Sequence, residues 1–458
     1  MRKKTGPEIS ESKTLMRKLF VVALPIAAQN LISASLTLVD TLMVGSLGET
    51  ELATVGLATQ IFFIFWMILF GFTGGTITYM AQFWGKRDMV NIRRVVGIAV
   101  TVCFGVGLVF FFGCVIFPEK VLGIFTNIPE VLAMGKNWVR LGAVIFLPWS
   151  IVVPLSASLK ATQQTSIPLK ISIVVFSTNT ILGIILIFGF LGAPQMGIMG
   201  ACTATVVSRI LEFLLYIYVV FARKNIVSGP LGEFFSWNKA LFRRVIANAI
   251  PTTINEAMWG LGTSMYNAAY GRMGVTAFAA IQAGNSIQNI FALACFSIGD
   301  AMLILVGEKL GAGELENAKK TAAKILKFAT IIGICAGLLL FLSSRFIVRL
   351  FDLTGTGVHY AILILIIFSI FMPFKIFNST IITGVLRAGG DTKFAMLSET
   401  AIVWLIGVPI AFIGALYLQL PIYLVVLMVQ IEEFTKFFVM TYRYRSLKWL
   451  KNLVSNIK

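Results

Sequence analysis

The sequence predicts an all-α membrane protein whose twelve transmembrane helices form two similar halves. Three observations lead to this prediction: an apolar composition, an internal repeat and twelve apolar runs of spanning length. Of the 458 residues, 58% are hydrophobic and 13% are charged, whereas soluble domains carry about 25% charged residues. One water-soluble core cannot bury so much apolar surface, so a lipid bilayer has to surround the chain.

The internal repeat covers most of the chain. At a shift of 226 residues, the following positions coincide without a gap: Pro25, Gly45, Gly48, Ala53 and Gly85 with Pro251, Gly271, Gly274, Ala279 and Gly311. Farther on, Leu159-Lys160-Ala161 coincides with Leu386-Arg387-Ala388 at a shift of 227. Two apolar halves of one design are typical of secondary transporters.

The transmembrane helices are predicted from run length, because a bilayer core of about 30 Å needs roughly 20 apolar residues per helix. Twelve runs qualify: 20–44, 52–80, 95–117, 138–158, 168–190, 198–222, 246–270, 276–306, 325–343, 359–385, 394–416 and 421–441. The predicted parts are a tail (1–19), an N-lobe (20–222), a linker (223–245), a C-lobe (246–441) and a second tail (442–458).

The orientation follows from the basic residues. With the N-terminus in the cytoplasm, thirty of the 38 Lys and Arg residues lie on the cytoplasmic side, six lie outside, and Arg209 and Lys375 lie within spans. This bias places both termini in the cytoplasm and the protein in the plasma (inner) membrane. Anionic lipid beside a basic inner face accounts for the net charge of +18, so nucleic acid is not an expected partner.

Ionisable residues inside spans mark candidate functional positions, because charge is expensive in lipid. Asp40 has apolar neighbours near the outer end of the first span, and no basic residue lies within one helical turn. A proton or Na⁺ can neutralise such a carboxylate, which suits an ion-coupling site. The alternative is a carboxylate that snorkels to the interface.

Glu256, in the seventh span, is the candidate acid of the second half and a possible second Na⁺ ligand. It can instead counter a cationic substrate or make a structural hydrogen bond. Lys375, in the tenth span, needs a partner, for which Glu399 or Glu256 is expected. Arg209 and Glu212 are three residues apart and can pair on one helix face. Glu432, Glu433 and Lys436 are interpreted in the same way.

Other in-span residues suggest a substrate cleft and hinges. The polar side chains expected to line a cleft, together with Lys375, are Gln29, Asn30, Asn255, Gln282 and Asn378. Pro25 and Pro251 are matched hinge candidates, because proline removes a helix hydrogen bond, although static bends explain them equally well.

The sequence does not predict an enzyme. It contains no Walker loop, no glycine-rich turn after a strand and one histidine, His359. No cofactor is expected.

Several motifs together resemble the multidrug and toxic compound extrusion (MATE) transporters. They are Leu24-Pro25-Ile26, Val39-Asp40-Thr41-Leu42-Met43-Val44-Gly45-Ser46-Leu47-Gly48, Pro251 with Glu256, Val306-Gly307-Glu308-Lys309-Leu310-Gly311-Ala312-Gly313 and Gly384-Val385-Leu386-Arg387-Ala388-Gly389-Gly390-Asp391-Thr392. The resemblance covers roughly residues 15–450. It implies two pseudo-symmetric six-helix lobes and export of organic cations driven by Na⁺ or H⁺ entry.

The resemblance also assigns residues to a cation-coupling site. Asp40 matches the first-span aspartate of the family's N-lobe site, and Asn179 and Thr205 match its fifth-span Asn and sixth-span Thr. Gly183 stands where the family has a further acid. Glu256 matches the seventh-span Glu of a C-lobe site, but the tenth-span Asp of that site is missing around Lys375.

The sequence thus predicts a monomeric multidrug antiporter embedded among membrane lipids. A flippase for a lipid-linked or anionic substrate is the alternative, and a non-transporting sensory protein is a third hypothesis. The coupling ion (Na⁺ or H⁺) and the native substrate stay open.

Overall fold

The computed structural model describes residues 6–351, 353 and 355–457, and these residues form helices and loops without a strand. The helices are listed here in chain order: α1 (Gly6–Gly45), α2 (Glu49–Gly85), α3 (Met89–Ile116), α4 (Pro118–Leu122), α5 (Pro129–Gly142), α6 (Phe146–Ala161), α7 (Ser166–Phe188), α8 (Ile198–Ile217), α9 (Leu231–Phe235), α10 (Lys239–Gly271), α11 (Val275–Gly311), α12 (Leu315–Ile347), α13 (Gly355–Ser379), α14 (Thr392–Ile402), α15 (Val408–Phe412), α16 (Ile422–Val429) and α17 (Ile431–Arg445).

Among the described residues, ten helical stretches are long and apolar enough to cross a membrane. Two of the twelve predicted spans do not meet that test. The span at 246–270 belongs to α10, which carries several polar side chains, and the span at 421–441 is divided into α16 and α17 at Gln430. Short π-helical segments also interrupt two spans, at Thr380–Leu386 after α13 and at Val403–Gly407 after α14.

The chain divides into two compact units. Unit 1 contains the chain up to Ala27, Ala81–Lys86 and the chain from Ile250 onward, and unit 2 contains Ala28–Met80 and Arg87–Ala249. The predicted boundaries of lobes, linker and tails remain predictions. Helix α1 starts at Gly6, inside the predicted first tail, and α17 runs to Arg445, inside the predicted second tail.

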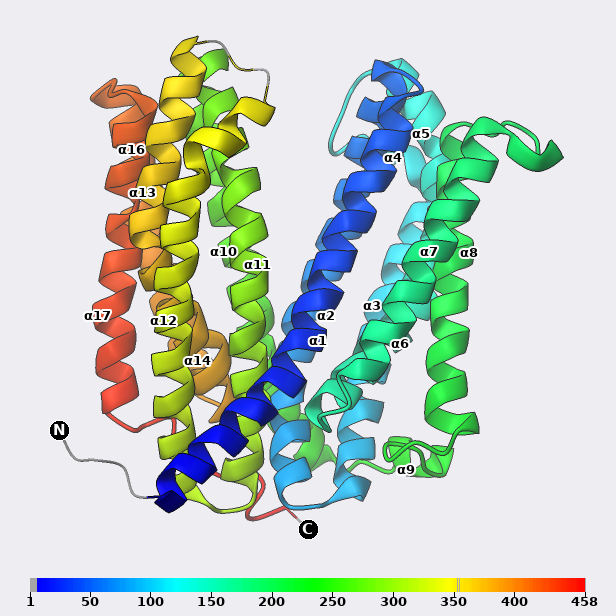
Figure 1. Cartoon of the computed structure of the whole chain (residues 1–458). Helices are drawn as coiled ribbons and strands as arrows, with labels where there is room; N and C mark the ends of the chain where they lie inside the picture. The colour runs from blue at the N-terminus through cyan, green and yellow to red at the C-terminus, as the bar shows by residue number, and fades with distance from the viewer. Residues whose placement is uncertain (1–5, 352, 354, 458) are drawn as a thin grey trace. The chain divides into compact units, whose positions relative to one another are not determined.

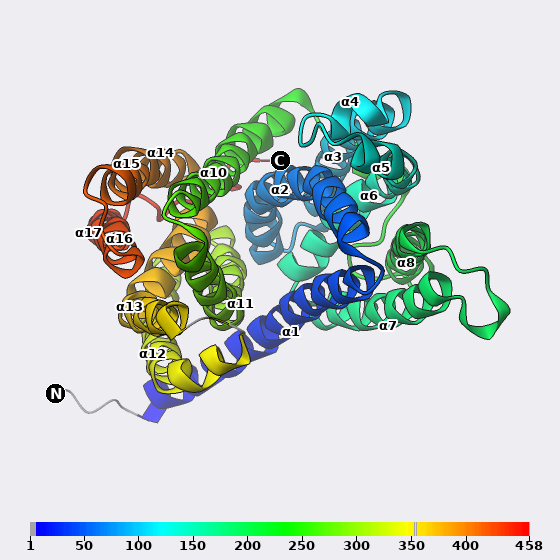
Figure 2. The same ribbon diagram turned by 90° about the horizontal axis from the view of Figure 1, so that it is seen from above.

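In unit 2, α3 packs against α6, and α7 packs against α8 (Figures 1 and 2). Aromatic rings fill the core. The Phe62 and Phe65 rings of α2 lie 4.8 and 4.7 Å from the Phe146 ring of α6, centroid to centroid. Short α9 lies against α3, where Arg93 forms an ion pair of 2.6 Å with Glu233. The linker is therefore held to the unit that precedes it.

In unit 1, α11 packs against α12 and α13, and α12 and α13 pack against each other (Figures 1 and 2). Its outward surfaces are strongly apolar. Leu338, Leu339, Leu342 and Phe346 of α12 are exposed, as expected for a helix that faces lipid acyl chains.

The repeat is visible in local contacts. Asp88 accepts a hydrogen bond from the Asn91 side chain (2.7 Å), and its repeat mate Glu314 accepts one from Asn317 (3.0 Å). Hydrogen bonds from Lys309 and Asn317 lower the pKa of Glu314 from its ordinary value. Both halves therefore begin their third long helix with an acidic side chain that binds an asparagine one turn on.

The ends of α2 and α11 cross at matched glycines. A Cβ atom at Gly85 would overlap the carbonyl oxygen of Glu308, and a Cβ atom at Gly311 would overlap that of Gln82. Gln82 and Glu308 are themselves 226 residues apart, as are Gly85 and Gly311. The crossing is thus internally symmetric, and it requires glycine because the two backbones touch.

The C-terminal segment after α17 covers this crossing. The Gln82 side chain donates to the carbonyls of Ala388 (2.8 Å) and Lys451 (3.2 Å) and accepts from the Leu453 amide (2.7 Å). Lys86 donates to the Ile457 carbonyl at 2.9 Å, and Trp449 is completely buried. The segment is therefore an integral part of unit 1.

We predict that Gly311→Ala lowers the free energy of unfolding by about 1–3 kcal/mol, because the added methyl group overpacks the crossing. Thermal denaturation of the purified protein in detergent measures the effect. Gly56→Ala is the matched control, since no atom lies within 4 Å of a Cβ placed there. Equal melting temperatures for the two variants would contradict the close crossing.

Candidate functional site

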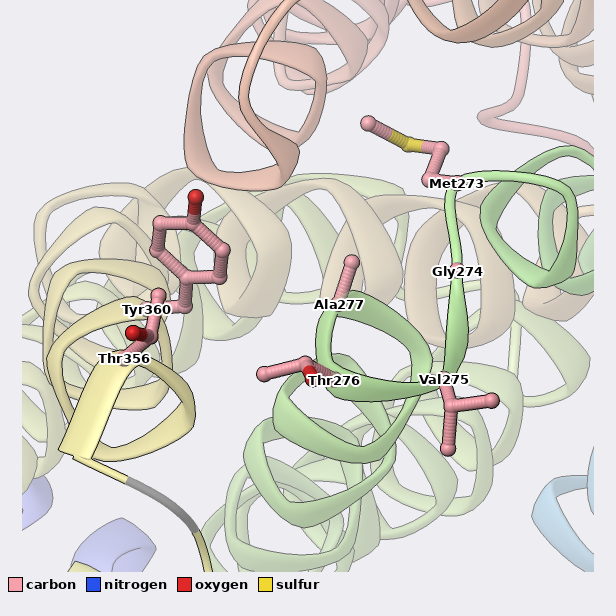
Figure 3. Close-up of a pocket in the computed structure, with 7 residues that line it drawn as sticks. All are labelled: Met273, Gly274, Val275, Thr276, Ala277, Thr356 and Tyr360. Atoms are coloured by element: carbon pink, nitrogen blue, oxygen red, sulfur yellow. The ribbon is translucent and has the colours of Figure 1, made fainter.

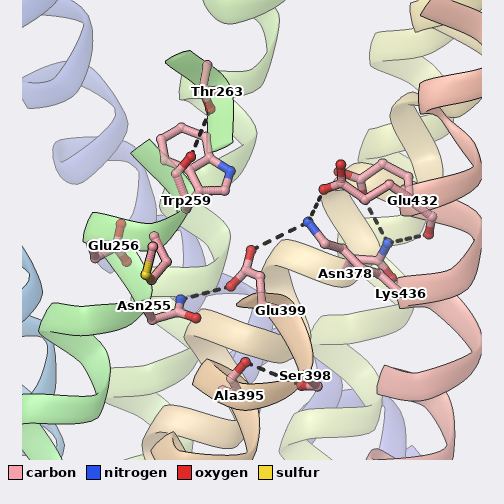
Figure 4. Close-up of polar contacts among 12 residues, drawn as sticks. Asn255, Glu256, Trp259, Thr263, Asn378, Ala395, Ser398, Glu399, Glu432 and Lys436 are labelled. Carbon is pink, nitrogen blue, oxygen red and sulfur yellow. Dashed lines mark hydrogen bonds and ion pairs between the residues drawn. The ribbon is translucent and has the colours of Figure 1, made fainter. Parts of the chain in front are cut away.

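A network of buried polar side chains links α10, α14 and α17 in unit 1 (Figure 4). Asn255 donates to a carboxylate oxygen of Glu399 at 2.8 Å. The Lys436 ammonium lies 3.7 Å from the other Glu399 oxygen and 2.5 Å from a Glu432 oxygen. Lys436 is therefore shared by two acids, and the prediction that it pairs with Glu432 along one helix is confirmed.

Two further contacts extend the network. The Tyr266 hydroxyl donates to Glu432. Asn378 of α13, whose side chain is 1% exposed, donates to both the carbonyl and a carboxylate oxygen of Glu433, each at 2.8 Å. Asn255 and Asn378, both predicted to line a cleft, are thus hydrogen-bonded to acids in unit 1.

Glu256 is paired with Arg387, which follows α13. The Arg387 guanidinium lies 2.5 Å from a Glu256 oxygen, and both side chains are largely buried. The sequence analysis noted Arg387 within a motif and did not connect it with Glu256, because the two residues are 131 positions apart.

The predicted partners of Lys375 were wrong. Lys375 donates to the side-chain carbonyl of Gln288 at 3.1 Å, whereas Glu256 binds Arg387 and Glu399 binds Asn255 and Lys436. The amide of Gln288 lies on α11, and its neighbourhood to α13 is a tertiary contact that no spacing along the chain reveals.

In unit 2, Asn179 of α7 meets α8. Its side-chain amide donates to the hydroxyls of Thr205 (3.2 Å) and Ser208 (3.1 Å). The Asn179 side chain is buried, and its carbonyl oxygen has no hydrogen-bond partner among the described residues. The structure thus brings together Asn179 and Thr205, and it adds Ser208, which the sequence analysis missed. An unsatisfied buried carbonyl oxygen is suited to a cation or a donor.

Asp40 lies on α1, which runs parallel to α7. The two helices touch where Gln29 donates to Ser172 (3.2 Å), and a Cβ at Gly183 would lie 3.0 Å from the Met43 methyl group. With a helix rise of about 1.5 Å per residue, Asp40 lies roughly level with the turn between Asn179 and Gly183. The side chain is half-buried and makes no hydrogen bond or ion pair with any described residue.

Arg209 of α8 interacts electrostatically with Asp40. Its guanidinium lies 2.7 Å from Glu212 and stacks 4.7 Å from the centre of the Trp149 ring. The predicted pairing of Arg209 with Glu212 is confirmed. At a shift of 227 residues Arg209 coincides with Lys436, so the last span of each half carries a base bound to an acid of its own helix.

The remaining predicted residues are dispersed. Asn30 is half-buried on α1, Gln282 is exposed on α11, and Pro25 and Pro251 lie inside α1 and α10. The residue that sequence reasoning came nearest to identifying is Tyr266, which is the repeat mate of Asp40. The polar group at this level of the second half is a phenol that binds Glu432.

A pocket of about 300 Å³ opens where α11 and α13 begin (Figure 3). It is lined by Met273, Gly274, Val275, Thr276, Ala277, Thr356 and Tyr360. None of the predicted site residues lines it. Within the described ranges no group of three or more His, Cys, Asp or Glu side chains is arranged to hold a metal ion.

A family model, MatE, matches the chain twice, over residues 25–185 and 251–413. Among curated relatives, the probable multidrug resistance protein NorM of Thermotoga maritima is 24% identical over 413 residues, which cover 90% of this chain and 88% of that protein. The probable multidrug resistance protein YoeA of Bacillus subtilis is 24% identical over 459 residues, covering 100% and 97%. The two family matches start at the repeat mates Pro25 and Pro251.

Solved structures share the fold. A MOP superfamily transporter from Pyrococcus furiosus, whose reverse polarity of the binding pocket suggests a different function, aligns with a TM-score of 0.84 at 16% identity, over 98% of this chain and 100% of that one. A MATE in the straight conformation aligns with a TM-score of 0.85 at 16% identity, over 95% and 97%. The predicted twelve-helix, two-lobed fold is confirmed.

We predict that Arg387→Met lowers the free energy of unfolding by about 3–5 kcal/mol, because it leaves Glu256 buried and unpaired. The double variant Arg387→Met/Glu256→Gln should recover most of that loss, which thermal denaturation in detergent will measure. Lys309→Met, which breaks an exposed pair with Glu314 (2.8 Å), is the control and should change stability by less than about 1 kcal/mol. A double variant no more stable than Arg387→Met would show that the pair is not what holds Arg387.

Proposed function

The chain belongs to the MatE family, whose members are ion-coupled membrane transporters and not enzymes, and from that premise we propose that it exports amphipathic organic cations in exchange for entering Na⁺ or H⁺. The observation that carries the proposal is Asp40, a half-buried carboxylate on a spanning helix without an ion-pair or hydrogen-bond partner. A carboxylate in that position favours a bound cation, a proton, or a cationic substrate.

Asp40 is proposed to alternate between the coupling ion and the substrate cation. Entering Na⁺ or H⁺ neutralises the carboxylate, and the organic cation then loses its counter-charge and leaves. The two ligands are coupled because they compete for one negative charge, and an ion can shift the transporter between states only by its difference in affinity for them. Movement of α1 about Pro25 is the proposed accompanying change.

Asn179 and Thr205 are proposed to complete the coupling site. They lie at roughly the level of Asp40 on the neighbouring helices, and the free carbonyl oxygen of Asn179 is available to a cation. A chain without the family's second acid at Gly183, where Met43 lies instead, has one negative charge fewer in this region.

Glu256 is proposed to act mainly through Arg387, because that guanidinium already supplies its positive charge. Among the cleft candidates, Asn255, Asn378 and Lys375 are engaged within unit 1. We therefore assign substrate contacts first to Gln29, Asn30 and Gln282, whose side chains are half-buried or exposed. A monomer is the proposed functional form.

The flippase alternative is less well supported. A lipid pyrophosphate needs several free cationic side chains. Arg209 and Lys436 are each paired with a glutamate of their own helix, and Arg387 is paired with Glu256. The Pyrococcus transporter with reverse pocket polarity shares the fold, yet the bases described here are neutralised within their own units.

We predict that Asp40→Asn abolishes gradient-driven efflux of a cationic dye from proteoliposomes, because the variant cannot exchange one cation for another. Na⁺ and H⁺ gradients are imposed separately, and the gradient that drives the wild-type protein identifies the coupling ion. Glu119→Gln, at an exposed acid paired with Lys136, is the control and should transport normally. Normal driven efflux by Asp40→Asn would remove Asp40 from the mechanism.

The excess of basic residues on one side supports an inner-membrane protein with both termini in the cytoplasm. We predict that a membrane-impermeant maleimide labels Lys120→Cys, but not Lys320→Cys, in intact cells. The background is Cys335→Ser, because the other four native cysteines are buried. After lysis both introduced cysteines should react. The reverse pattern would invert the proposed topology.

A further inference from the structure

Unit 1 contains a buried group of three carboxylates and two amines, formed by Glu399, Glu432, Glu433, Lys375 and Lys436. Lys436 serves two of the acids, at 2.5 Å from Glu432 and 3.7 Å from Glu399. Tyr266 donates a further hydrogen bond to Glu432, and Asn255 donates one to Glu399. Both acids are thereby stabilised in the ionised form.

Glu433 and Lys375 have only neutral hydrogen-bond partners. Glu433 accepts from the Asn378 amide at 2.8 Å, and Lys375 donates to the Gln288 carbonyl at 3.1 Å. Neither forms an ion pair with a described residue, although Lys375 interacts electrostatically with Glu433 over a longer distance. If all five groups are ionised, the net charge is −1.

A net charge inside a membrane-spanning bundle is strongly unfavourable, because lipid does not solvate it. Among the three acids, Glu433 has the weakest support for its charge. The group reaches neutrality if Glu433 takes up one proton from water, which changes the count from −1 to zero.

Asn378 is able to bind Glu433 in either form. Its amide nitrogen donates to the carboxylate, while its carbonyl oxygen has no hydrogen-bond partner, although the side chain is 1% exposed. A protonated Glu433 has a hydroxyl to donate, and rotation of the Asn378 amide by half a turn presents the carbonyl oxygen to it. Protonation would therefore satisfy the buried oxygen that is now without a partner.

We propose that Glu433, held by Asn378, is a proton-binding site in the C-terminal half of the chain. It is separate from Asp40, and it stands whether or not Asp40 carries the coupling ion. The titratable and charged groups that surround it are Tyr266 and Tyr270 of α10, Lys375 of α13, Glu399 of α14, and Glu432 and Lys436 of α17 itself.

Infrared difference spectroscopy during a pH titration of the full-length protein in lipid tests the proposal without requiring transport. The Asp40→Asn variant serves as background, so that the acid proposed for ion coupling does not contribute. We expect a protonated-carboxyl band that Glu433→Gln removes and Glu399→Gln, the matched control, retains. Survival of the band in Glu433→Gln, its loss only in Glu399→Gln, or its removal by Na⁺ at constant pH would overturn the assignment.

Stability measurements provide an independent test. Glu433→Gln mimics the protonated acid and should melt at or above the wild-type temperature near neutral pH, whereas Glu432→Gln removes a partner of Lys436 and should melt lower. Lys375→Met should be destabilising, and adding Glu433→Gln should restore its melting temperature. A Glu433→Gln variant that melts as low as Glu432→Gln would show that Glu433 is ionised in the folded protein.

Discussion

Charges within the spanning helices have to be neutralised by the protein itself, because lipid acyl chains neither solvate nor screen them. Most of the intramembrane ions described here obey this constraint through short pairs: Arg209 with Glu212, Arg387 with Glu256, and Lys436 with Glu432 and Glu399. Asp40, Glu433 and Lys375 have no such pair. These exceptions are the groups whose charge a mobile cation or proton is best placed to compensate, which is why the proposed chemistry centres on carboxylates without an ion pair.

The two halves share a scaffold and differ in charge. Matched glycines cross at Gly85 and Gly311, matched acids bind Asn91 and Asn317, and a base on the last span pairs with an acid of its own helix in each half. Asp40, in contrast, has Tyr266 as its repeat mate, and Tyr266 binds an acid supplied by α17. Repetition preserves the backbone geometry, because close packing tolerates little change, while individual side chains are free to divide the chemistry between the halves.

Much of the fold was predictable before any contact was known. Run length predicted the spans because the bilayer sets a minimum length, and the coincidence of Pro25 with Pro251 and of Gly85 with Gly311 predicted the repeat that the family model matches twice. Pairs close along one helix, such as Arg209 with Glu212, were predictable because helix periodicity fixes which side chains are neighbours. The division of the last span at Gln430 and the folded segment around Trp449 were not, because each depends on what packs beside it.

The amino-acid sequence by itself determined the class of the protein, the number of spans, the duplicated design and the positions of the intramembrane charges. Tertiary structure alone decided how those charges are shared. Asn255 and Glu399 are 144 residues apart, and Glu256 and Arg387 are 131 apart, so no local periodicity relates them. The prediction for Lys375 failed for the same reason: its partner, Gln288, comes from a helix 87 residues earlier. Partners across helices are selected by packing geometry, which exists only once the helices have assembled.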